Sequence, residues 1–144
     1  MYIGQNPEKG EIMSYHIPDR ELFEGRVLIK YEYNKELRCD LQGLCHIRED
    51  IVFDGDLFDI PCIYKKILSH KNGFTRAINI AGNLVYIADN GYRIFDRELP
   101  FIPELCEDFD ETGIAKIACL IEGVYIVKGY MNNDGEMFLK SYNS

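Results

Sequence analysis

The spacing of cysteine and histidine residues along a chain can indicate nucleophilic catalysis or zinc binding. Cys45 and His46 are adjacent, and a thiol beside an imidazole is a potential nucleophile and base. Neighbouring residues of a strand point to opposite faces, however, so these two side chains cannot share a hydrogen bond. Zinc ligands would come from the scattered set Cys39, Cys45, His46 and Cys62. That set lacks the close paired spacing of structural zinc sites, so we expect no catalytic residue, no metal and no cofactor.

The carboxylates are the second group of residues that could bind a ligand or a metal ion. The densest run contains Glu107, Asp108, Asp110 and Glu111, and a smaller cluster surrounds Gly55. Calcium would require several oxygens converging at the spacing of a binding loop, and neither run has that spacing. A charge run usually forms a solvated face. Phosphate-binding loops and nucleotide fingerprints are missing from the sequence.

Length and composition limit the class of protein. The 144 residues are 47% hydrophobic and 28% charged, which suits a single domain spanning 1–144. A formal charge of −8 argues against a general nucleic-acid or anionic-membrane binder, and no apolar run has the length of a membrane helix. The first ten residues do not resemble a secretory signal, and the five cysteines are odd in number. We therefore expect a cytoplasmic protein with reduced thiols.

Most of the periodic segments predict strands. β-Branched and aromatic residues are concentrated in 26–33, 74–80, 84–87, 114–121 and 124–131, and the segment 74–80 alternates between two faces. Glu122 and Gly123 predict a hairpin, and type I′ turns are expected at Asn90–Gly91 and in 132–135. Helical signal is restricted to one or two turns in 103–109 and an ambiguous stretch in 63–69. The predicted class is mainly β with little helix.

An internal repeat organises these strands. The block 53–61 matches 95–103 at a spacing of 42 residues, with five of nine positions identical. Segments beginning near Phe23, Gly73 and Gly113 each lead into a hairpin. We predict three stacked units of roughly 40 residues, at about 23–61, 73–103 and 109–142, with 1–22 as an N-terminal cap. One such unit is too small to bury its own apolar face, so stacking must complete the core. The proline that ends each matched block should block further strand pairing.

These units resemble the WG-repeat (KWG-repeat) family of bacterial β-repeat proteins. The third unit is the most similar, through the segments 109–117 and 128–135, whereas the tryptophan positions carry Leu44, Leu84 and Lys128. His46 is aligned with Tyr86 and Tyr130 at the aromatic position that follows. The resemblance, which covers about 23–142, implies a binding or scaffolding module without established catalytic residues.

The predicted function is non-catalytic recognition of a protein or peptide. Rigid contact surface would come from Tyr86, Tyr92, Tyr125 and Tyr130, and the charged surface from Glu107, Asp108, Asp110 and Glu111. Two alternatives remain open at this point: an acidic inhibitor or immunity-type protein that neutralises a basic toxin or nuclease, and a small hydrolase that uses an Asp/Glu pair. The sequence is also compatible with a homo-oligomer, because a short stack of repeat units leaves unpaired strand edges that a second copy could cover.

Overall fold

A computed structural model of the chain describes residues 13–17, 22–47, 59–91, 93–95 and 101–140. They form three small antiparallel sheets with strand orders β1-β2-β3-β4, β5-β6-β7-β8 and β11-β10-β9, which we call the first, second and third sheets. The prediction of a mainly β chain is confirmed. Within the described residues, we find no helical segment with the length and hydrophobicity needed to span a bilayer.

Each sheet is a meander, in which consecutive strands of the chain pair antiparallel. The strands of the first sheet are β1 (Met13–His16), β2 (Val27–Asn34), β3 (Cys39–His46) and β4 (Ile60–Tyr64). Those of the second are β5 (Lys66–Lys71), β6 (Phe74–Ile78), β7 (Leu84–Ala88) and β8 (Ile94–Phe95). The third contains β9 (Ile114–Ile121), β10 (Tyr125–Asn132) and β11 (Met137–Leu139), with the 3-10 helix η1 (Pro103–Leu105) preceding β9.

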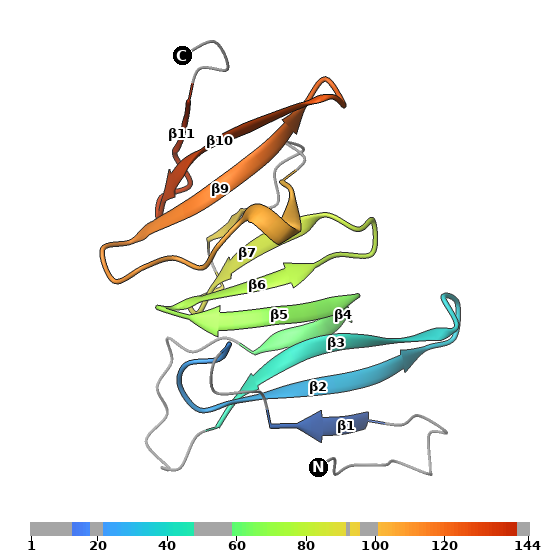
Figure 1. Cartoon of the computed structure of the whole chain (residues 1–144). Helices are drawn as coiled ribbons and strands as arrows, with labels where there is room; N and C mark the ends of the chain where they lie inside the picture. The colour runs from blue at the N-terminus through green and yellow to red at the C-terminus, as the bar shows by residue number, and fades with distance from the viewer. Residues whose placement is uncertain (1–12, 18–21, 48–58, 92, 96–100, 141–144) are drawn as a thin grey trace.

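The sheets are arranged in chain order, with the second between the other two (Figure 1). An aliphatic core that includes Leu44, Ala77 and Ile87 fills the seam between the first and second sheets. An aromatic core that includes Tyr86 and Phe109 fills the seam between the second and third. All five residues of β7 are buried, because this strand faces a core on both sides. The alternation predicted for 74–80 is confirmed over β6, whose side chains divide between the two cores.

In all three sheets the neighbouring strands follow one another in the chain, with four strands in the first and second sheets and three in the third. In the third, the segment 101–110 takes the place of a first strand, because Phe101 and Phe109 form antiparallel bridges with β9. Gly25, Gly73 and Gly113 precede β2, β6 and β9, and all three have φ between 81° and 83°. Glycine adopts this left-handed conformation without a steric penalty. This shared geometry supports stacked units, and their number stays a prediction.

The turns correct part of the sequence interpretation. Both residues have positive φ in Asn72–Gly73, which joins β5 to β6, and in the predicted Glu122–Gly123 turn. In the turns predicted as type I′ at Asn90–Gly91 and in 132–135, only the glycine has positive φ. Each of those glycines instead closes a turn by donating its N–H to the carbonyl three residues earlier. An Asn–Gly pair thus predicts a turn, and the type of that turn depends on the strands that it joins.

Several segments differ from their predicted roles. The helical alternative for 63–69 is wrong, because this stretch contributes to β4 and β5 and only the residue that joins them is outside a strand. In 103–109 the helix is limited to η1. Pro61 does not end strand pairing, since it lies inside β4 at an irregularity in the pairing with β3. Within the expected cap, Met13–His16 forms β1 and pairs with β2.

Candidate functional site

An open cleft lies between the second sheet and the segment that leads into β9. Its volume is about 1620 Å³. This exceeds the roughly 300–1,000 Å³ of small-molecule pockets, so the cleft has room for a polypeptide segment. The side formed by the second sheet carries Lys65, Lys66 and Lys71. The opposite side carries the acidic residues Glu104, Glu107, Asp110 and Glu111, with Lys116 of β9 beside them.

A charged cluster joins the two sides of this cleft. Arg76 Nε donates to Asp108 Oδ1 at 2.8 Å and to Ser69 Oγ at 2.9 Å. Ser69 also donates to Asp108 Oδ1, and Arg76 Nη1 donates to the Cys106 carbonyl. The Arg76 and Asp108 side chains are only 14% and 21% exposed, so water screens this pair weakly. The cluster therefore fixes the segment 106–108 against the second sheet.

The predicted acidic residues are thus brought together, and they differ in their freedom to bind. Asp108 is committed to Arg76. Asp110 accepts hydrogen bonds from the Thr112 hydroxyl and from the Ile114 N–H, and these hold the pKa of its carboxyl below the usual range. A general acid needs a raised pKa, so the lowered pKa of Asp110 does not suit the acid member of an Asp/Glu pair. Glu107 and Glu111 are exposed on the cleft.

The predicted tyrosines do not form one surface. Tyr86 is fully buried and donates its hydroxyl to the Glu107 carbonyl at 2.8 Å, so its assignment as contact surface is wrong. Tyr92 lies outside the described residues. Tyr125 and Tyr130 are 40% and 47% exposed but lie on opposite faces of β10. Tyr130 is directly opposite Lys116, which lines the cleft, so these two side chains lie on the same face of the third sheet.

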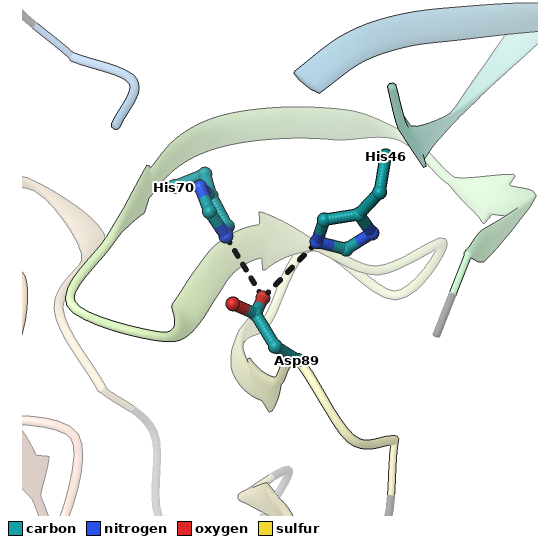
Figure 2. A group of neighbouring side chains, drawn as sticks. All are labelled: His46, His70 and Asp89. Atoms are coloured by element: carbon teal, nitrogen blue, oxygen red, sulfur yellow. Dashed lines mark hydrogen bonds and ion pairs between the residues drawn. The ribbon is translucent and has the colours of Figure 1, made fainter. Parts of the chain in front are cut away.

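A second cluster lies in the other seam, where His46, His70 and Asp89 converge (Figure 2). The Asp89 Oδ1 atom is 2.8 Å from His70 Nε2 and 3.4 Å from His46 Nε2. Both imidazoles are buried, and the Asp89 side chain is 26% exposed. The imidazole rings meet edge to face with centroids 5.5 Å apart. This cluster joins the end of β3 to the second sheet.

Backbone contacts position each member of this cluster. The Asp89 N–H donates to the Gly73 carbonyl at 2.9 Å, which fixes the turn after β7. The His70 backbone exchanges hydrogen bonds with Leu22 and Glu24, and its Nδ1 contacts the Glu24 carbonyl. The His46 N–H donates to Asp59 Oδ1 at 3.0 Å. The three side chains are therefore held by strand and turn geometry.

The charges of the cluster stabilise one another. Burial alone would raise the pKa of Asp89, but hydrogen bonds from His46 and His70 outweigh it and hold that pKa well below its usual range. Burial alone would lower the pKa of His70, yet the hydrogen bond to Asp89 outweighs it and the net shift is upward. The geometry thus favours a positive charge beside the Asp89 carboxylate.

This cluster was not predicted from the sequence. Asp89 fits the pattern of a turn residue, and no motif surrounds His70. The alignment of His46 with Tyr86 and Tyr130 is wrong, because the strand register places Cys45, opposite Leu28, at the equivalent position. His46 therefore points to the other face, into the seam. The sequence feature that could have given the correct register is the glycine before β2, β6 and β9, because equivalent strand positions lie at the same distance from it.

The cysteines are free thiols in the described residues. Burial raises the pKa of Cys62 and Cys119 to about 11, so both thiols are protonated at neutral pH. Protonated thiols are poor nucleophiles, and the absence of a catalytic cysteine stays a prediction.

Comparison of the chain with family models, with curated proteins and with solved structures finds no match. The interpretation of the cleft and of the histidine cluster therefore depends on their own geometry.

Proposed function

We propose that this protein is a recognition module that binds an extended segment of a protein partner in the open cleft between its second sheet and the segment that leads into β9. The single observation that carries the proposal is the distribution of charge in that cleft. Three exposed lysines occupy the side of the second sheet, and four exposed carboxylates occupy the other side.

The chemistry of the partner follows from this distribution. A segment lying along the cleft would place acidic side chains toward Lys66 and Lys71 and basic side chains toward Glu107 and Glu111. Complementary charge increases association rate and specificity more than affinity. The exposed ring of Tyr130 and its cross-strand neighbour Phe138 supply apolar contact beside the cleft. A peptide of mixed charge with an adjacent apolar residue is the expected ligand.

Charge reversal on each side of the cleft tests the proposal. Random peptides displayed on phage are selected on the wild-type protein, and the enriched peptide is synthesised for affinity measurement. We expect mixed charge in the selected peptides and weaker binding by both Lys66→Glu and Glu107→Lys. The matched controls are Lys35→Glu and Glu36→Lys, which make the same charge changes in the exposed turn before β3. They should bind as the wild type does.

The pattern of losses discriminates between functions. If Glu107→Lys abolishes binding while Lys66→Glu strengthens it, the acidic side alone binds, as an inhibitor of a basic protein would require. If neither variant changes the affinity, or if both controls reduce it equally, the cleft is not the recognition site and the proposal is wrong.

A further inference from the structure

The second cluster has the donor atoms of a transition-metal site. His46 and His70 offer one imidazole nitrogen each and Asp89 one carboxylate oxygen, and these three atoms all lie within 4.8 Å of one another. Imidazole nitrogen together with carboxylate oxygen is a donor set that suits zinc and related divalent ions. Magnesium and calcium prefer oxygen donors alone.

The tautomer of His70 favours a cation between the side chains. Its Nδ1 contacts the Glu24 carbonyl, which can only accept, so Nδ1 carries a proton. In the neutral ring, Nε2 is then a bare lone pair directed at Asp89 Oδ1, 2.8 Å away. Two lone pairs at that distance repel each other. Either a proton or a metal ion between them removes the repulsion.

The distances are close to those of a metal site. Zinc bonds of about 2.0–2.1 Å in a tetrahedral site separate the ligand atoms by about 3.3 Å. His46 Nε2 is already 3.4 Å from Asp89 Oδ1. His70 Nε2 would move away from Asp89 by about 0.5 Å to reach the same tetrahedral separation. The two imidazole nitrogens are within 4.8 Å of each other and would approach one another to reach the tetrahedral separation. Rotation of the partly exposed Asp89 carboxylate can accommodate both movements.

The groups that contact the second ring nitrogen of each histidine are arranged as they are around metal-binding histidines. A ligating histidine commonly uses its second ring nitrogen to contact a carbonyl or carboxylate, which fixes its orientation. The Glu24 carbonyl does this for His70, and Asp59 Oδ1 lies 3.6 Å from His46 Nδ1. The exposed edge of Asp89 gives solvent access to one side of the cluster.

We propose that His46, His70 and Asp89 bind one zinc-type divalent cation, with water in the fourth position, and that this ion clamps the first sheet to the second. His46 comes from the first sheet, and the other two ligands come from the second. The ion would thus cross-link segments that are otherwise joined by packing and a few hydrogen bonds.

Direct metal binding tests the proposal. Protein without a polyhistidine tag is treated with a chelator, desalted and titrated with zinc by calorimetry and with cobalt by visible absorption. We expect one ion per chain and the intense visible bands of tetrahedral cobalt. His70→Asn and Asp89→Asn should each weaken zinc binding by more than about 100-fold, because outer contacts alone contribute about 10–100-fold.

The remaining histidine gives the matched control. His16 is exposed on β1, and His16→Asn should bind zinc as the wild type does. Nitrogen-detected NMR of the wild-type imidazoles provides a second measurement that needs no variant. Zinc should shift the Nε2 signals of His46 and His70 and leave those of His16 in place. No saturable binding, or binding that survives His70→Asn and Asp89→Asn in folded protein, would overturn the proposal.

Discussion

The two seams of the stack bury polar groups in different ways. The first seam contains two imidazoles around one carboxylate within an aliphatic core. The second contains a guanidinium, a carboxylate and a hydroxyl beside an aromatic core. Arginine keeps its charge at every physiological pH, whereas histidine loses or gains its proton near neutrality. The second seam is therefore permanently paired, while the first contains the side chains of the proposed metal site.

The largest expected effect comes from the aromatic core of the second seam. Phe109 is 1% exposed, and its ring centroid lies 4.3 Å from that of Phe74 and 5.3 Å from that of Tyr86. Phe109→Ala should lower the free energy of unfolding by about 3–5 kcal/mol through lost burial and a cavity. Denaturant unfolding measures this, with the exposed Phe138→Ala as control. Equal effects of the two substitutions would contradict the assignment of Phe109 to the core.

Breaking the charged cluster should have a smaller effect. Arg76→Met leaves the carboxylate of Asp108 in the seam with only Ser69 as a partner among the contacts described above. Removal of one member of a fully buried pair costs about 3–5 kcal/mol, and partial exposure reduces this to about 1–3 kcal/mol here. A double-mutant cycle with Asp108→Asn isolates the coupling. Additive effects would show that the pair does not stabilise the second seam.

The histidine cluster should contribute less when no metal is present. In chelator-treated protein, His70→Asn removes the contacts to the Glu24 carbonyl and Asp89, at an expected cost of about 1–2 kcal/mol. Added zinc should then raise the unfolding temperature of the wild type but not of this variant, because a ligand that binds only the folded state stabilises it. The same zinc shift in both proteins would contradict the clamp.

Tyr86 provides the smallest effect at neutral pH and a clear effect at alkaline pH. Tyr86→Phe should cost about 1 kcal/mol through the lost hydrogen bond to the Glu107 carbonyl. Burial raises the pKa of Tyr86 above that of the unfolded chain. Below a pH of about 10, the Tyr86 hydroxyl keeps its proton in both the folded and the unfolded chain. Above that pH only the unfolded chain loses the proton, so the free energy of unfolding falls by up to about 1.4 kcal/mol per pH unit. Tyr86→Phe should show a shallower decline, and the remainder comes from buried groups such as Cys62 and Cys119, whose pKa values are also raised. Equal alkaline slopes in the two proteins would count against burial of the phenol.

Local elements could be predicted from the sequence better than the contacts between them. Alternation in 74–78 and the Glu122–Gly123 turn follow from side-chain period and backbone preference, which act over a few residues. The cluster of His46, His70 and Asp89 depends on how two sheets stack, and no short-range pattern records that. The register error at His46 exchanged the faces of its strand, because a shift of one residue is enough to do so. Tyr86 resembled a surface residue because the sheet that covers it is distant in the sequence.

Anomalous diffraction at the zinc edge, from crystals of tag-free protein grown with one equivalent of zinc, tests the account most directly. We expect one strong peak bonded to His46 Nε2, His70 Nε2 and Asp89, in a map whose three sheets lie in chain order. A peak at another position, or a map in which His46 and His70 are far apart, would contradict the clamp between the first and second sheets.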